Sequence, residues 1–191
     1  MRRLYLVRHA PTHAKTMVGW SDLPADCSDA AAFARLGALL PETAALVSSD
    51  LSRAVATADQ LSGTRRRLPH VPGLRELHFG AWELRGFAEI EAEDPAHIRA
   101  FWERPGDIAA PGGESWNGLA DRVTSALDDL LAQEAGDVIV VSHFGPIGAA
   151  IQRAEGLAPE VAFGHRIENL SVTEIEVAGG TWRLVRANHL A

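Results

Sequence analysis

The sequence has one cysteine, no long apolar run and fewer basic than acidic residues. Because Cys27 is the only cysteine, an intrachain disulfide and a zinc site built from several cysteines are both excluded. The apolar run near the start, Leu4 to Val7, is too short for a signal-peptide core or a membrane span. No later segment is long and apolar enough to cross a bilayer, so we expect a soluble cytoplasmic protein without membrane contact.

The shortage of basic residues argues against one class of partner. Lysine and arginine number 18 against 25 acidic residues, a net charge of −7, which disfavours a nucleic-acid binder held by bulk charge. Any bound anion must therefore be held by a local basic pocket. With 47% hydrophobic and 23% charged residues the composition is globular, and 191 residues is the length of one domain. We expect a single domain over residues 1–191.

Short apolar runs alternate with amphipathic stretches along the chain. Strands are predicted at residues 4–7, 45–48 and 138–141, and at 67–71 with weaker support because Pro69 interrupts the run. Helices are predicted at residues 28–40 with Ser28 as N-cap, 52–61, 115–134 and 145–155, and a hairpin at 171–177 and 181–187. Residues 73–114, with broken helical pieces, predict a small helical insertion. The alternation predicts a three-layer α/β/α sandwich with a mostly parallel central sheet.

Two histidines directly follow predicted buried strands. His9 comes after the first strand and His143 after the strand at 138–141. Ligands of open α/β sheets bind beyond the carboxyl ends of the strands, so both imidazoles face one crevice if these strands are neighbours. A neutral imidazole can attack phosphorus, and arginine forks such as that of Arg8 hold phosphoryl oxygens. These residue types therefore favour phosphoryl transfer.

Five segments in a fixed order are more specific than a lone Arg-His pair: LVRHAPT, SSDLSRAVATADQL, LRELHFGAWE, VSHFGPIGA and IENLSVTEIE. Together they resemble the histidine phosphatase superfamily, also called phosphoglycerate-mutase-like, over nearly the whole chain. The resemblance implies a nucleophile, His9, a proton donor, Glu76, phosphate-binding arginines, Arg8 and Arg53, and a second site histidine, His143. We expect Thr12 to add one hydrogen bond to the phosphate. The resemblance also implies a reaction that needs no metal and no cofactor.

Several positions depart from the family's pattern. Ala10 replaces the usual glycine, Lys15 stands where mutases have an asparagine that contacts phosphate, and Phe144-Gly145 replaces a Gly-Asn pattern of mutases. These differences favour a phosphatase over a mutase, and PGGESW resembles a loop of phosphatases related to the α-ribazole phosphate enzymes. We therefore expect a phosphomonoesterase that hydrolyses a small phosphorylated metabolite through a phosphohistidine intermediate, and the loop gives a weak pointer to a substrate similar to α-ribazole phosphate.

Alternatives remain at this stage. The same fold serves a phosphoglycerate mutase, a phosphatase of protein side chains, or a regulatory binding protein without activity. Glu83 competes with Glu76 as the acid, and Asn169 either supports the site or serves only in a turn. The oligomeric state is open. It is also open whether the substrate contacts further residues, including two tryptophans of the insertion and one just after it: Lys15, His78, the run Arg65–Arg67, Trp82, Trp102 and Trp116.

Overall fold

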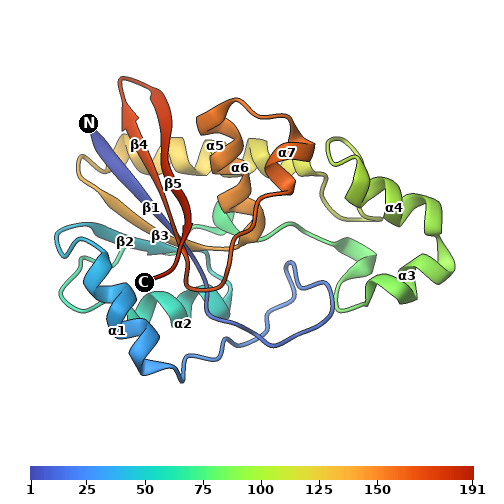
Figure 1. The fold of residues 1–191 in the computed structure, drawn as a ribbon, viewed down its shortest axis with the longest axis horizontal. Helices are drawn as coiled ribbons and strands as arrows, with labels where there is room; N and C mark the ends of the chain where they lie inside the picture. The colour runs from blue at the N-terminus through green and yellow to red at the C-terminus, as the bar shows by residue number, and fades with distance from the viewer.

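A five-stranded sheet in the order β2-β3-β1-β4-β5 forms the centre of the computed structural model, which describes residues 1–191 (Figure 1). The strands are β1 (Arg2–Arg8), β2 (Ala45–Ser48), β3 (Val138–Ser142), β4 (Val172–Ala178) and β5 (Thr181–His189). β3 pairs in parallel with both β1 and β2, whereas β4 is antiparallel to β1 and to β5. The predicted α/β fold is confirmed, and the predicted hairpin forms the antiparallel part of a mixed sheet.

Four helices cover the two faces of the sheet. The helices of one face are α1 (Ala30–Leu39) and α2 (Ser52–Gln60), and those of the other are α5 (Trp116–Gln133) and α6 (Phe144–Glu155). In Figure 1 the first pair lies below the sheet and the second pair above it. The arrangement is the three-layer sandwich that the alternation of strands and helices predicts.

β1 shows why the apolar run at its centre is continuous. Leu4 and Leu6 join the core under α5 and α6, while Tyr5 and Val7 join the core under α1 and α2. Successive side chains of a strand point to opposite faces, so a strand covered by helices on both faces must be apolar throughout. Because the run is buried on both faces, the polar residues that follow it are held at the edge of the sheet.

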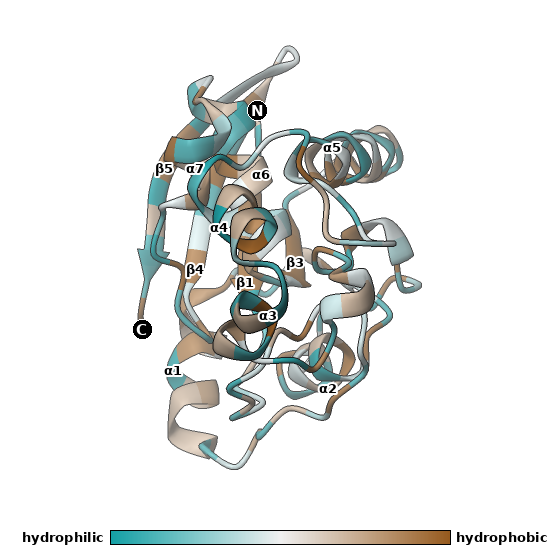
Figure 2. Cartoon of the chain, turned by 90° about the vertical axis from the view of Figure 1, so that its right-hand side faces the viewer, coloured by the Kyte–Doolittle hydropathy of each residue, from teal (hydrophilic) through white to brown (hydrophobic).

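Residues 73–114, where a helical insertion is predicted, hold short helical pieces. These are the end of η1 (Pro72–Leu74), η2 (Gly80–Trp82), α3 (Phe87–Glu93) and α4 (Pro95–Glu103). Figure 2 shows α3 and α4 in front of one end of the sheet. Trp82 and Phe101 anchor the insertion, with ring centroids 5.3 Å apart and edge-to-face packing.

Three local predictions were wrong or incomplete. Residues 67–71 form no strand: Leu68 donates to the Leu46 carbonyl at 2.8 Å, but Pro69 has no N–H with which to continue a ladder. α1 is capped by Asp29, whose side chain accepts from the Ala32 N–H, and not by Ser28. A short helix, α7 (Pro159–Phe163), was not predicted. No helix of the structure has both the length and the apolar character that a membrane span needs.

Candidate active site

The two predicted site histidines lie side by side at the carboxyl ends of β1 and β3. Arg8 pairs with Ser142 in the parallel register, so the residues that follow them, His9 and His143, leave the sheet together. Their ring centroids are 5.0 Å apart and both side chains are buried. The neighbouring strands therefore bring both imidazoles to one crevice.

Hydrogen bonds set the orientation and the tautomer of His9. Its Nδ1 lies 2.7 Å from the Ala10 carbonyl oxygen. A carbonyl oxygen only accepts, so Nδ1 carries the proton and Nε2 keeps its lone pair. The Asn169 amide donates to the His9 carbonyl at 2.7 Å, and Thr57 Oγ1 accepts from the Ala10 N–H at 2.9 Å. His9 is thus held with Nε2 unprotonated and free of hydrogen bonds to the neighbouring backbone.

Burial keeps both histidines neutral. It lowers the pKa of His9 to about 3, against the opposing pull of the Ala10 carbonyl, and the charges of Arg53 and Arg8 add to the lowering. The pKa of His143 is also well below its usual value, first through burial and then through His9 and the same two arginines. At neutral pH the His9 ring is therefore unprotonated at Nε2.

Two arginines place positive charge beside the histidines. Arg53, at the start of α2, is 1% exposed and donates to the carbonyls of Ser21 at 2.9 Å and Gly19 at 2.6 Å. Arg8 donates to the Ile167 carbonyl at 2.6 Å. Two buried nitrogens, Arg8 Nε and His143 Nδ1, have no hydrogen-bond partner within the chain. The cluster of Arg8, His9, Arg53 and His143, hereafter the cationic cup, has the donors and the charge to bind an anion.

Glu76 lies beside the cationic cup and is 8% exposed. Its Oε1 accepts from the N–H groups of Leu77 and Gly145, each at 2.9 Å. Burial raises the pKa of Glu76 above its usual value, even though these hydrogen bonds and the charges of Arg53 and Arg8 act the other way. A Cβ at Gly145 would lie 2.4 Å from Glu76 Oε1, so only glycine leaves room for the carboxylate.

The competing acid Glu83 is occupied elsewhere. Its carboxylate accepts from the N–H groups of Gly19, Trp20, Ser21 and Phe79, and from the Ser21 hydroxyl at 2.6 Å. Burial alone would raise the pKa of Glu83, but these hydrogen bonds outweigh it and lower the pKa. Glu83 therefore holds residues 19–21, the segment whose carbonyls orient Arg53. Sequence reasoning missed this role because the bonds join residues about sixty positions apart.

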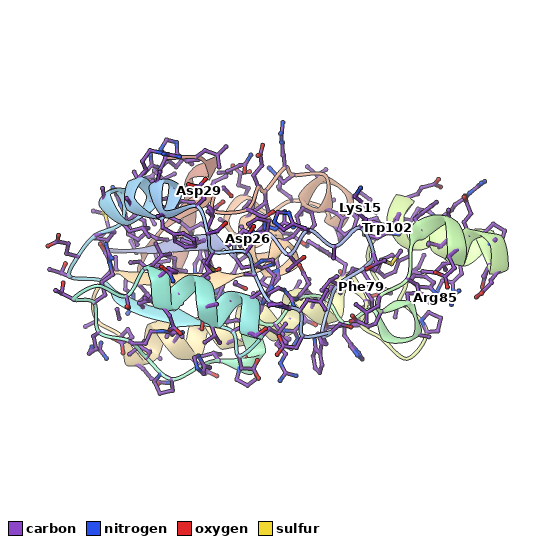
Figure 3. All side chains as sticks on the ribbon, turned by 90° about the horizontal axis from the view of Figure 1, so that it is seen from below. Lys15, Asp26, Asp29, Phe79, Arg85 and Trp102 are labelled. Atoms are coloured by element: carbon purple, nitrogen blue, oxygen red, sulfur yellow. The ribbon has the colours of Figure 1, made fainter.

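A pocket of about 350 Å³ opens over three residues of the cationic cup, whereas His143 is fully buried, with its Nε2 2.7 Å from Ser49 Oγ, and does not line the pocket. Its lining consists of the cup residues Arg8, His9 and Arg53, the acid Glu76, the loop residues Thr12, Ala14, Lys15, Thr16, Met17 and Val18, and the rings of Phe79, Phe87, Trp102 and Phe144. Figure 3 shows Lys15, Phe79 and Trp102 close to α4, at the end of the sheet where the insertion lies. Thr12 and Lys15, both considered as substrate contacts, thus face this pocket.

Other residues considered from the sequence lie outside the pocket lining. His78 packs on Trp20, with ring centroids 4.6 Å apart. Arg65 donates to carbonyls at the end of α1, including that of Leu40 at 2.8 Å, and Arg66 pairs with Glu134. Of the tryptophans, Trp82 and Trp116 are core residues, and only Trp102 lines the pocket.

Comparison with known proteins identifies the family. The model of the histidine phosphatase superfamily (branch 1) matches residues 4–190. The chain belongs to the histidine phosphatase superfamily. The resemblance in the five sequence segments is thereby confirmed.

Curated relatives of this histidine phosphatase carry both mutase and phosphatase names. A probable phosphoglycerate mutase, GpmB of Proteus mirabilis, is 28% identical over 189 residues, which cover 95% of this chain and 88% of that protein. A metal-independent phosphoserine phosphatase of Arabidopsis thaliana is 32% identical over 142 residues, which cover 72% of this chain and 58% of that protein. The second match thus spans little more than half of its relative.

Solved structures of similar proteins align over nearly the full length of this histidine phosphatase. Bacillus stearothermophilus YhfR superposes with a TM-score of 0.91 at 29% identity, covering 100% of this chain and 98% of that one. A mycobacterial glucosyl-3-phosphoglycerate phosphatase gives 0.87 at 28% identity, with 100% of both chains covered. The α-ribazole phosphatase of Shigella flexneri gives 0.86 at 25% identity, covering 99% and 97%. With its family and these relatives, the chain is a phosphatase-type enzyme.

Proposed function

We propose that the protein is a metal-independent phosphomonoesterase that works through a phosphohistidine at His9. The observation that carries the proposal is the state of His9, whose Nδ1 proton is bound by the Ala10 carbonyl while Nε2 is unprotonated beside Arg8 and Arg53. An unprotonated imidazole nitrogen among cations is suited to attack a phosphoryl group, which carries negative charge. Thr12 and Lys15 add a hydroxyl and a charge at the pocket lining.

In the first step, His9 Nε2 attacks phosphorus and the bond from phosphorus to the ester oxygen breaks. Glu76, whose pKa burial raises and so shifts toward the protonated acid, gives its proton to the leaving oxygen. Arg8, Arg53 and His143 donate to the non-bridging oxygens. Each such donor is worth on the order of 3 kcal/mol in comparable oxyanion sites.

In the second step, water attacks the phosphorus of phosphohistidine in line with the bond to Nε2. Glu76 is now a carboxylate and accepts a proton from this water. The bond from Nε2 to phosphorus breaks, and inorganic phosphate and neutral His9 are regenerated. The arginines supply the charge and neutral His143 supplies a hydrogen-bond donor in both steps, so the proposed reaction needs no metal and no cofactor.

The size of the pocket favours a small substrate. About 350 Å³ at the end of the sheet beside α3 and α4 is enough for a small phosphorylated metabolite. The likeness to an α-ribazole phosphatase and to a glucosyl-3-phosphoglycerate phosphatase supports a small phosphate ester. We also propose that residues 1–191 act as one domain, with residues 73–114 as the insertion that forms one side of this pocket.

The nucleophile is tested by trapping the intermediate. Protein quenched during turnover of a ³²P-labelled ester is expected to carry acid-labile label at His9, and His9→Ala is expected to lose label and turnover together. His165→Ala serves as control, since His165 makes no side-chain hydrogen bond in the structure and does not line the pocket. We expect inhibition by vanadate and indifference to EDTA. Full turnover in His9→Ala would contradict the assignment.

A phosphoglycerate mutase remains the second candidate, because a curated relative carries that name. A mutase transfers the phosphoryl group back to a substrate hydroxyl, so it requires a bisphosphate primer and releases little phosphate. The phosphatase releases one phosphate for each ester consumed without a primer. A regulatory protein without activity would hydrolyse no ester of a broad panel.

A further inference from the structure

Four aromatic rings belong to the lining of the pocket over the cationic cup. Phe79, Phe87, Trp102 and Phe144, hereafter the aromatic wall, all line the pocket. The rings of Phe79 and Trp102 are 6.3 Å apart between centroids. Phe163 packs behind the wall, 5.2 Å from Trp102 and 5.9 Å from Phe144. Phe79 and Trp102 thus pack on each other, and Phe163 links Trp102 to Phe144 from behind.

This wall adjoins the proton donor at two points. Phe79 follows Glu76 by three residues, and Phe144 directly precedes Gly145, whose N–H is bonded to Glu76 Oε1 at 2.9 Å. The acid must lie beside the ester oxygen that it protonates, so the alcohol leaves the phosphorus on the Glu76 side. The first atoms of that alcohol therefore meet the aromatic wall.

The chemistry of the wall selects among alcohols. Its rings offer large apolar surfaces, and Phe87 is 43% exposed. An apolar ligand that covers this ring would remove apolar area from water, which favours binding. Hydroxyl groups pressed against the wall would lose their hydrogen bonds to water, and the wall offers one donor in return, the buried Trp102 Nε1–H, which has no partner in the structure. Outside the cationic cup and Glu76, the hydroxyl and ammonium groups of the pocket lining belong to Thr12, Lys15 and Thr16 of one loop.

We infer that the substrate is a phosphate monoester of an alcohol with a flat apolar group, such as an aromatic ring, close to the ester oxygen. A polyhydroxylated alcohol of the sugar type is disfavoured. This inference rests on the proposed function, because it takes the cationic cup as the phosphate site and Glu76 as the acid on the leaving side.

The test compares two esters of primary alcohols of similar bulk, 2-(2-naphthyl)ethyl phosphate and glucose 6-phosphate. Their leaving groups are chemically alike, so the ratio of kcat/KM reports on contacts with the rest of the alcohol. We expect the naphthyl ester to be preferred by at least about tenfold. Equal rates, or a preference for glucose 6-phosphate, would overturn the inference.

Variants locate the preference on the wall. Phe87→Ser is expected to reduce the ratio of the two kcat/KM values at least about threefold, because it removes apolar contact from one ester only. Val161→Ser is the matched control, since Val161 is 55% exposed on α7 and does not line the pocket. It is expected to leave the ratio unchanged. A ratio that Phe87→Ser leaves intact counts against the wall as the source of selectivity.

Failure of the proposed function gives a different result. Vanadate has no leaving group, so its inhibition reports on the cationic cup alone. Hydrolysis of 4-nitrophenyl phosphate together with vanadate inhibition, but without the naphthyl preference, would reject the aromatic substrate class and retain the phosphatase. Absence of hydrolysis of every ester would reject the phosphatase itself.

Discussion

Burial prepares two residues of the site for opposite tasks. In both His9 and Glu76 it disfavours the charged form, so the pKa of the imidazole is lowered and that of the carboxyl is raised. The neutral imidazole has the lone pair that a nucleophile needs, and a raised pKa favours the protonated carboxyl that an acid needs. Burial thus shifts each group toward the form that its proposed role needs, and the charges of Arg8 and Arg53 add to the shift of His9 and oppose the shift of Glu76.

The first prediction at this scale concerns the pH dependence of the rate. For an alkyl phosphate, kcat is expected to fall as pH rises through the raised pKa of Glu76, because the acid loses its proton. With 4-nitrophenyl phosphate, whose leaving group needs no proton, this alkaline fall should be much weaker. His9, with its pKa lowered to about 3, should cause no acidic fall above about pH 4. Steady-state rates from pH 4 to 9 on both esters test this.

The Glu76→Gln variant is the matched control for that profile. It should slow the alkyl ester at least about a hundredfold and leave 4-nitrophenyl phosphate far less affected. Identical losses with the two esters would show that Glu76 does not protonate the leaving group.

A second prediction is that the same variant stabilises the fold. The folded pKa of Glu76 is raised, so its favourable contribution to folding is present at low pH and is lost as pH rises through that pKa. The amide introduced by Glu76→Gln would keep an oxygen for the N–H groups of Leu77 and Gly145 and would carry no charge. Thermal unfolding should therefore give a higher Tm for Glu76→Gln at pH 8, with the difference shrinking toward pH 4. A lower Tm at pH 8 would contradict the burial argument.

At the scale of elements, the backbone of residues 19–21 forms hydrogen bonds to both the Glu83 carboxylate and the Arg53 guanidinium. Its N–H groups donate to Glu83, while the carbonyls of Gly19 and Ser21 accept from Arg53. A Cβ at Gly19 would lie 2.1 Å from the Leu77 carbonyl oxygen, so the segment passes where only glycine fits. The position of the Arg53 guanidinium is therefore set by Glu83 through the backbone between them.

The third prediction follows from this linkage. Glu83→Gln replaces one accepting oxygen with an NH₂ group that would face backbone N–H donors, so the segment should shift and Arg53 with it. We expect weaker vanadate inhibition and a kcat/KM reduced about tenfold or more, with the pH profile of kcat retained because Glu76 is untouched. Glu89→Gln is the control, since Glu89 is exposed and pairs only with Arg85. A flattened alkaline limb in Glu83→Gln would instead make Glu83 the acid.

Local sequence patterns predicted the elements whose structure depends on residues close to one another in the chain. The apolar runs of β1 and β3 located the residues that follow them, and Ser115 was correctly taken as the start of α5, where it accepts from the Gly118 N–H at 3.1 Å. The role of Glu83 depends on partners about sixty residues away, which no local pattern encodes. Residues 67–71 have strand-like composition, but Pro69 allows only isolated bonds to β2.

At the scale of the whole molecule, the site depends on the order of the strands. His9 and His143 meet because β1 and β3 are neighbours, which the sequence allowed but did not establish. The aromatic wall combines rings from the insertion and from the start of α6, so its composition could be recognised only after folding. The residues of the cationic cup could therefore be named from motifs, whereas those of the aromatic wall could not.

The burial of both histidines also affects the stability of the whole chain toward acid, which is the fourth prediction. Their folded pKa values lie below the ordinary 6.5, that of His9 at about 3. Below about pH 6.5 the unfolded chain binds protons that the folded chain does not, so stability is full above this pH and falls below it. The slope is up to about 1.4 kcal/mol per pH unit for each histidine. Glu76, whose shift has the opposite sign, offsets part of this loss.

Chemical denaturation between pH 7 and pH 4 tests this loss of stability. His9→Gln has no group to titrate at this position, so its free energy of unfolding should decline less steeply over that interval than that of the unmodified protein. His165→Ala, the control, should follow the unmodified protein because its ring lies outside the buried site. If the slope of His9→Gln equals that of the unmodified protein, His9 is protonated in the folded state at these pH values. An imidazolium would then occupy the position of the proposed nucleophile.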